Sequence, residues 1–181
     1  MRLVKCDDAG LYETAAVLNS GGVAVIPTDT VYGLAAHPSF PAAVSRLYTI
    51  KAREAAKPIA LLASDAEKAE SFVGGFPASA KALTRHWPGA LTIVAKGEGL
   101  HVPDHAWTRR LIAACGGALR VTSANLSGRR PATDAPAALA DVGLSADIVA
   151  DDGVSPGGVP STVVRVSDDA TEILRQGAIE I

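Results

Sequence analysis

The sequence predicts a mixed α/β (α+β) fold that occupies a single domain over residues 1–181. The chain has 181 residues, of which 48% are hydrophobic, and a formal net charge of -2, so it can form a core and is not of the disordered class. Short apolar runs alternate with segments of helical periodicity, which is typical of a sheet covered by helices. Several of these runs follow one another without a helix, which favours a mixed sheet over a purely parallel one.

Helices are predicted where apolar residues recur at helical spacing between start and stop signals. Leu11, Ala15 and Leu18 define a helix over Ala9–Asn19 that ends at a pair of glycines. The next helix begins with Pro41 in its first turn and runs to about Lys51. Further helices are expected after the Ser64-Asp65 cap and over Pro77–His86, Thr108–Cys115 and Asp134–Asp141.

Strands are predicted at the short apolar runs bounded by proline, glycine or polar residues. They are Val23–Ile26, Pro58–Ala63, Leu91–Ala95, Leu119–Thr122, Asp147–Ala150, Thr162–Val166 and Glu172–Leu174.

Several protein classes are excluded by composition. No apolar run approaches the ~18–20 residues that a membrane span requires, and the acidic N-terminal segment does not resemble a secretory signal. Cys6 and Cys115 form no disulfide framework, so we expect a cytoplasmic protein. His101 and His105 are four residues apart, but Pro103 between them breaks a helix, so no metal site is predicted.

Four polar segments each lie at the end of a predicted strand or helix, where α/β sheets place their ligands. The segment 27–34 contains Thr28, Asp29 and Thr30, which offer donors and acceptors to a small polar ligand but equally suit a turn. The segment 51–58 brings three cations to a helix end, where they either complement the helix dipole or hold phosphate oxygens. The third and fourth are a Ser/Asn-rich turn within 120–128 and a pair of segments at 160–164 and 174–177.

The order of these segments is more specific than any one of them. Along the chain come Pro27-Thr28-Asp29-Thr30-Val31-Tyr32-Gly33-Leu34, Lys51-x-Arg53, Trp87-Pro88-Gly89-Ala90-Leu91-Thr92, Ser123-Ala124-Asn125-Leu126-Ser127-Gly128, Pro160-Ser161-Thr162 and Leu174-Arg175-x-Gly177. From about Gly21 to Ile179, the sequence resembles the YrdC/TsaC-like family of threonylcarbamoyl-AMP synthases.

The resemblance implies a twisted open mixed sheet, flanked by helices, around a positively charged cavity. It implies an enzyme, a nucleotidyltransferase that forms threonylcarbamoyl-AMP and pyrophosphate from L-threonine, bicarbonate or CO2, and ATP. A ligase complex then transfers the threonylcarbamoyl group to adenosine 37 of tRNA to give the t6A modification. Mg2+ would be carried by the ATP phosphates, with no metal ligands from the protein.

The same resemblance assigns roles to eight side chains. Lys51, Arg53, Ser123 and Asn125 match the family's Lys-x-Arg and Ser-x-Asn signature and would be catalytic. By similarity, ATP would be bound by Arg53, Lys57, Ser123 and Arg175, and L-threonine by Thr30 and Ser161. Both reactants are anionic, so cations between them would offset their repulsion.

The sequence departs from the family pattern after Lys96. Family members usually continue through a longer loop to a strand with an arginine that contacts threonine, whereas here a short segment 97–105 places His101 nearest that position. Glu54 also stands where a proline usually follows the signature arginine. Our hypothesis is that Arg120, three residues before Ser123, supplies the missing cation, although strand alternation puts the two side chains on opposite faces.

Two alternatives to the synthase remain open from the sequence. One is a paralogue that acts on a different carbamoyl substrate. The other is an RNA-binding or ribosome-associated module, although the net charge and the 4% aromatic content do not favour it.

Overall fold

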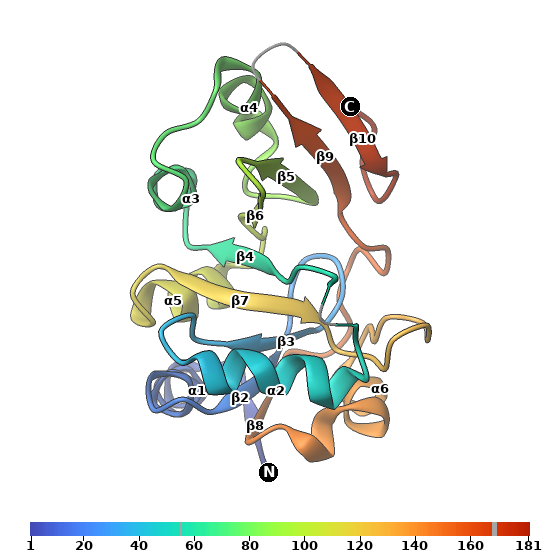
Figure 1. Cartoon of the computed structure of the whole chain (residues 1–181). Helices are drawn as coiled ribbons and strands as arrows, with labels where there is room; N and C mark the ends of the chain where they lie inside the picture. Colours follow the sequence, from blue (N-terminus) through green and yellow to red (C-terminus); the bar gives the residue numbers. More distant parts are fainter. Residues whose placement is uncertain (55, 168–169) are drawn as a thin grey trace.

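The computed structural model describes residues 1–54, 56–167 and 170–181, and its centre is a twisted ten-stranded sheet (Figure 1). The strand order is β1-β8-β2-β3-β7-β4-β6-β5-β9-β10. The strands are β1 (Arg2–Lys5), β2 (Val23–Ile26), β3 (Gly33–Ala36), β4 (Ala60–Ala63), β5 (Leu91–Ala95), β6 (Glu98–His101), β7 (Ala118–Ser123), β8 (Ile148–Asp151), β9 (Thr162–Val166) and β10 (Thr171–Arg175). Parallel pairs such as β1 with β8 and β5 with β9 occur beside antiparallel pairs such as β3 with β7, so the predicted mixed sheet is confirmed.

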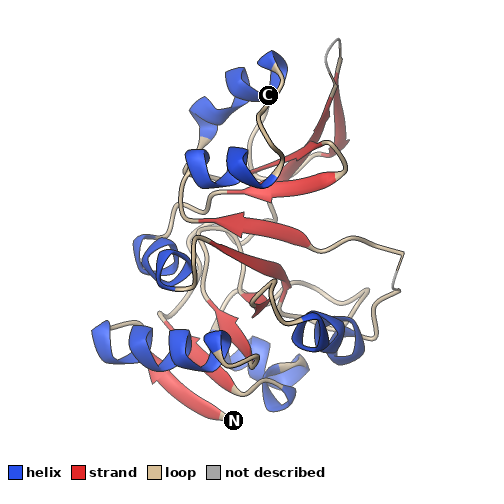
Figure 2. Ribbon diagram, turned by 60° about the vertical axis from the view of Figure 1, so that its left-hand side comes forward, coloured by secondary structure: helices blue, strands red, loops and turns tan. Residues whose placement is uncertain are grey.

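Helices cover both sides of the lower part of the sheet and one side of its upper part (Figure 2). They are α1 (Asp8–Asn19), α2 (Pro41–Lys51), α3 (Ala66–Phe72), α4 (Ala78–Leu83), α5 (Ala106–Ala114) and α6 (Ala135–Asp141), with short 3-10 helices η1 (Thr84–His86) and η2 (Gly143–Ser145). None of the helices in the described part of the chain is long and apolar enough to cross a membrane.

Three buried clusters attach the helices to the sheet, and the alternation of strand residues decides which cluster each joins. Leu62 belongs to the cluster with α1 and α5, whereas its neighbour Leu61 belongs to the cluster with α3 and α4. The third cluster joins α2 and α6 to β2 and β3, for example through Leu47 and Leu34. A leucine buried to this extent contributes about 1.5–3 kcal/mol to stability.

Three strands were not predicted from the sequence. β1 is a largely exposed edge strand without a clear apolar alternation, and β3 consists of small residues and one leucine. Gly33 in β3 is required by close packing, because a Cβ there would lie 2.5 Å from Cγ1 of Val121 on β7.

The third missed strand, β6, lies in the segment 97–105 that we expected to be a loop. Lys96 and Gly97 both have positive φ, at 51° and 85°, which is the backbone of a tight two-residue hairpin turn between β5 and β6. His101 is therefore the last residue of a strand, and the following helix begins at Ala106 with His105 as its N-cap, two residues before the predicted start.

Candidate active-site cavity

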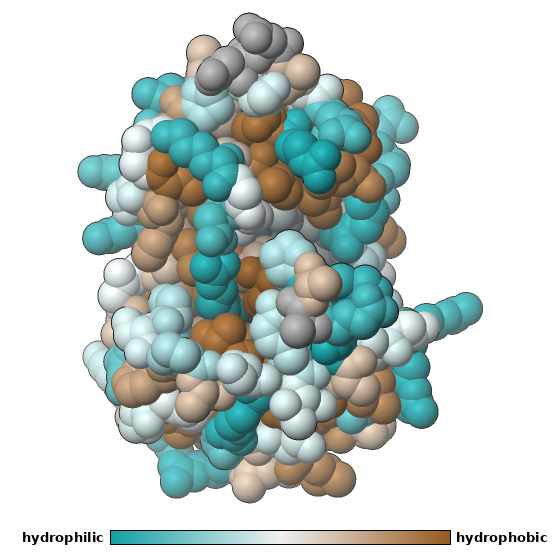
Figure 3. Space-filling model, in the orientation of Figure 1, coloured by the Kyte–Doolittle hydropathy of each residue, from teal (hydrophilic) through white to brown (hydrophobic). Residues whose placement is uncertain are grey.

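A cavity of about 1160 Å³ opens over the middle of the sheet. Residues of β4, β5, β6, β7 and β9 form its floor, and its rim is formed by Arg53, Lys57, Pro58, the loops 28–32 and 160–161, and the end of β10 at Leu174 and Arg175. Hydrophobic residues are visible at the bottom of a hollow near the middle of the face shown in Figure 3.

Six of the eight predicted site residues line this cavity, although they come from five separate segments. They are Thr30, Arg53, Lys57, Ser123, Ser161 and Arg175. Lys51 and Asn125 do not lie among the lining residues, because both are buried behind Ser123.

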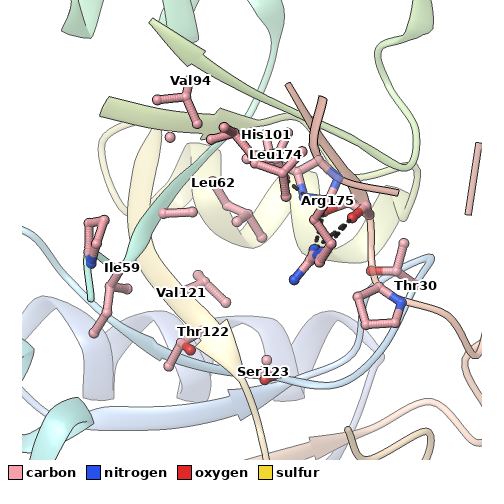
Figure 4. A pocket seen from close by; sticks show the side chains of 18 of the residues that line it. Thr30, Ile59, Leu62, Val94, His101, Val121, Thr122, Ser123, Leu174 and Arg175 are labelled. Atoms are coloured by element: carbon pink, nitrogen blue, oxygen red, sulfur yellow. Dashed lines mark hydrogen bonds between the residues drawn. The ribbon is translucent and has the colours of Figure 1, made fainter. Parts of the chain in front are cut away.

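The loop that carries Thr30 is held by the hydroxyl of Thr28. This hydroxyl accepts hydrogen bonds from the backbone N–H groups of Thr30 and Val31 at 3.1 and 3.2 Å, and Ser155 donates to the Thr28 carbonyl. Thr30 thus faces the cavity from a fixed turn (Figure 4). The Oδ1 atom of the adjacent Asp29 is buried and has no hydrogen-bond partner among the described residues.

The first polar wall of the cavity, which we call the lysine wall, consists of Ser123, which lines the cavity, and of Lys51 and Asn125 behind it. Lys51 is only 1% exposed, and its ammonium group donates to the backbone carbonyls of Ser123 and Asn125. The Asn125 amide in turn donates to the carbonyls of Leu126 and Arg129, both at 2.9 Å. The ammonium and amide thus shape the turn that presents Ser123.

Burial also changes the acidity of the ammonium in the lysine wall. The pKa of Lys51 is lowered to about 8, mainly by desolvation; the charge of Arg53 acts in the same direction, and Asp141 opposes the shift.

The two other basic residues of this segment lie beyond the end of α2. The helix ends at Lys51, and its C-cap Ala52 has a left-handed backbone with φ of 48°. Arg53 donates from Nε to the carbonyl of Lys57 at 3.2 Å and from Nη2 to that of Pro58 at 3.1 Å. Lys57 pairs with Glu54 at 3.2 Å on the exposed rim.

The second polar wall, which we call the hydroxyl wall, consists of Thr92, His101, Ser161 and Arg175. The hydroxyls of Thr92 and Ser161 are 2.8 Å apart, and the Arg175 guanidinium donates to the Ser161 carbonyl through Nε and Nη2. Gly177 is needed here because a Cβ at this position would clash with the Pro160 carbonyl, which accounts for the Arg-x-Gly spacing.

Charge on the cavity lining is one-sided. Arg53, Lys57, Lys96, Arg165 and Arg175 line it, and no aspartate or glutamate is among the described lining residues. This distribution favours anionic ligands, although Arg165 and Lys57 each pair with a glutamate outside the lining.

Arg120 does not supply the missing cation near the amino-acid end, so that hypothesis is wrong. Its guanidinium donates to both carboxylate oxygens of Glu98, at 2.6 and 3.1 Å, and to the Ile59 carbonyl. Arg120 is absent from the lining because it alternates with Val121 and Ser123, which face the cavity. His101 occupies the wall instead, whereas His105 caps α5 and pairs with Asp152 at 3.1 Å.

Several lining residues were missed by sequence reasoning. Thr92, Lys96 and Arg165 each lie on or directly after a predicted strand, and the alternation of β5 and β9 was the signal that could have placed their side chains on one face. His101 was noted only for its position, because β6 was not recognised as a strand.

Comparison with known proteins decides the family. Residues 16–177 match the Sua5/YciO/YrdC family, which is described as telomere recombination. The chain belongs to the Sua5/YciO/YrdC family. This finding confirms the resemblance drawn from the motifs.

Relatives in the Sua5/YciO/YrdC family carry a specific activity in their names. The chain is 35% identical to the threonylcarbamoyl-AMP synthase of Bacillus subtilis over 96% of its own length and 55% of that protein. It is 32% identical to a putative threonylcarbamoyl-AMP synthase of Mycobacterium leprae, covering 95% of this chain and 84% of the relative.

A solved structure supports the same fold for the whole chain. The crystal structure of P. abyssi Sua5 complexed with L-threonine superposes with a TM-score of 0.92 at 26% identity, over 98% of this chain and 58% of that one. The chain thus spans little more than half the length of the B. subtilis and P. abyssi proteins.

Proposed function

We propose that this chain is a nucleotidyltransferase that forms L-threonylcarbamoyl-AMP and pyrophosphate from L-threonine, bicarbonate or CO2, and ATP. The observation that carries the proposal is the convergence of Thr30, Ser161, Arg53, Ser123 and Arg175 on one cavity. The names of the relatives support the same reaction.

The proposed reaction needs no side-chain nucleophile. The amine of threonine attacks CO2, which forms a C–N bond and releases a proton, and a carbamate oxygen then attacks the α-phosphorus of ATP. The bond between the α-phosphorus and the bridging oxygen breaks, and pyrophosphate leaves. Catalysis then consists of positioning two anions and stabilising the charge that develops between them.

Each group on the lining has a role suited to its chemistry. Arg53, Lys57 and Arg175 would offset the negative charge of the triphosphate and the carbamate, and the Ser123 hydroxyl would donate to a phosphate oxygen. Thr30 and Ser161 would bind L-threonine from two sides. Lys51 and Asn125 would act through Ser123 as positioning residues, because their polar atoms are occupied by backbone carbonyls.

Mg2+ would enter as part of the ATP complex rather than as a resident metal. The described lining contains no carboxylate, and no group of three candidate metal ligands occurs among the described residues. Carboxylates are the side chains with which proteins hold Mg2+, so the phosphates and water would supply its ligands here.

The product would be used by a second protein. A mixed anhydride of a carbamate and AMP is an activated acyl donor, so we propose that a t6A ligase complex transfers the threonylcarbamoyl group to tRNA. ATP, bicarbonate and tRNA meet in the cytoplasm, which is where we propose that the chain acts.

The test is pyrophosphate release with ATP, bicarbonate and Mg2+, in which L-threonine is compared with L-serine and with no amino acid. We expect threonine-dependent release that falls at least ~100-fold in Arg53→Ala, a loss of about 2.7 kcal/mol of transition-state stabilisation. Arg110→Ala is the matched control, because Arg110 is exposed on α5 and pairs with Asp8 away from the cavity. Release that does not depend on an amino acid would contradict the proposal.

The two alternative functions give different results in the same experiment. A paralogue for another carbamoyl substrate would bind ATP without threonine-dependent release. An RNA-binding module would show salt-sensitive RNA affinity with no pyrophosphate release under any condition.

A further inference from the structure

His101 presents an unused nitrogen atom at the hydroxyl wall. This residue is 5% exposed, and Nε2 lies 2.9 Å from the carbonyl oxygen of Gly89. A carbonyl oxygen only accepts hydrogen bonds, so Nε2 carries the proton of the neutral ring and Nδ1 keeps a lone pair. Nδ1 forms no hydrogen bond to any residue that the structure describes.

Burial keeps the ring neutral. Burial is the main cause of the lowered pKa of His101, and the nearby Arg175 guanidinium lowers it further. Asp29 acts in the opposite direction and is outweighed. The ring therefore offers the cavity a hydrogen-bond acceptor rather than a cation.

The sheet register places polar and apolar lining residues of the cavity beside this acceptor. His101 pairs with Leu62 of β4 on one side and with Thr92 of β5 on the other, and Thr92 pairs with Val163 of β9. All four residues line the cavity. In Figure 4, His101, Leu62 and Arg175 border the same space.

We propose that Nδ1 of His101 accepts a hydrogen bond from the side-chain hydroxyl of the amino-acid substrate and thereby selects hydroxy amino acids. This inference rests on the proposed function and names the residue that recognises the side chain of the amino-acid substrate. Leu62 and Val163 provide an apolar surface for the methyl group attached to the same carbon. A substrate without the hydroxyl would cover Nδ1 and leave it without a partner, and sites of this kind discriminate strongly.

The other polar groups of an amino acid fit this position poorly. A carboxylate has no proton to donate to Nδ1, and the two lone pairs would repel each other. The α-amino group has to keep its own lone pair free for CO2, and the charge of Arg175 opposes an ammonium group at this wall.

The experiment compares L-threonine with L-2-aminobutyrate, which has the same carbon skeleton but lacks the hydroxyl. We expect the wild-type chain to favour threonine by at least ~100-fold in kcat/KM for pyrophosphate release. His101→Leu should reduce this preference at least ~10-fold, mainly through threonine, while the value for 2-aminobutyrate changes little. His101→Gln should restore part of the preference, because its amide can donate to Gly89 and still offer an oxygen to the cavity.

Arg120→Ala serves as the control, because Arg120 lies outside the cavity and should leave the preference unchanged. Equal losses for both amino acids in a folded His101→Leu protein would overturn the inference and leave the synthase intact. Calorimetric measurement of the binding of the two amino acids without ATP distinguishes a failure of the synthase proposal from a failure of the inference about His101. Selective threonine binding without pyrophosphate release would overturn the synthase alone, and a wild-type chain that binds both equally, or binds neither, would overturn the inference.

Discussion

The two polar walls of the cavity contain similar side chains but leave them in different states. In the lysine wall, the ammonium of Lys51 and the amide of Asn125 are occupied by backbone carbonyls behind Ser123. In the hydroxyl wall, the Arg175 guanidinium also donates to a backbone carbonyl but lines the cavity, and His101 Nδ1 has no partner among the described residues. The comparison teaches that a signature residue can be required because it builds the wall, while a residue outside the signature remains available to a ligand.

The sharpest test of this difference is Lys51→Met. The substitution leaves the carbonyls of Ser123 and Asn125 without their donor, so we expect the free energy of unfolding to fall by about 3 kcal/mol. Urea unfolding measures the loss. Lys57→Met is the matched control on the exposed rim, with an expected change below about 0.5 kcal/mol. Equal stability of the two variants would mean that Lys51 does not hold the wall together.

A second prediction distinguishes the role of Asn125 from that of Ser123. Asn125→Ala removes the donor to the Leu126 and Arg129 carbonyls, so it should cost about 1–2 kcal/mol of stability. Ser123→Ala should change stability little and raise the KM for ATP, because its hydroxyl lines the cavity. The opposite pattern would reverse the roles that we assign to the two side chains.

The pH dependence of stability provides a third, smaller effect. The pKa of Lys51 is lowered to about 8 in the folded chain, so between about pH 8 and pH 10 the unfolded chain binds more protons there than the folded chain. The folded state is therefore favoured increasingly as the pH rises through this window. We expect the stability of the wild-type chain relative to Lys51→Met to rise by at most about 1.4 kcal/mol per pH unit. A relative stability that falls over the same window would show that the pKa of Lys51 is raised in the folded chain, because the two carbonyls stabilise its ammonium form.

The smallest effect is expected for Arg120→Ala. This residue pairs with Glu98 outside the cavity, and both side chains are partly exposed, so the loss of stability should be below about 1 kcal/mol. The KM for L-threonine should not change in a pyrophosphate-release assay. A clear rise in that KM would reopen the hypothesis that Arg120 contacts the substrate.

Much of the fold could be predicted because its signals are local. The helical spacing of the apolar residues in α1, the cap at Asp65 and the run Leu91–Ala95 each identify an element without knowledge of the rest of the chain. β3 could not be found in this way, because its small residues become a strand only between β2 and β7. Strand formation there depends on partners that are distant in the sequence.

The candidate site was predictable in its membership but not in its geometry. The motifs identified Arg53, Ser123 and Arg175, which line the cavity, yet they treated Lys51 as an equal member. Whether an ammonium group faces solvent or carbonyls depends on a turn 72 residues away, which no local pattern reports. His101 was hidden for a related reason, since its orientation follows from the pairing of β6 with β4 and β5.

The strand order has a practical consequence for altering the chain. Because β1 and β10 are the two edges of the sheet, the N- and C-termini lie at opposite ends of the molecule (Figure 1). Along the sheet, nine strand spacings separate these edges by about 43 Å, so a circular permutant would need a long linker. A purification tag or fluorophore before Met1 would lie beside β1, at the sheet edge opposite the strand that carries Arg175.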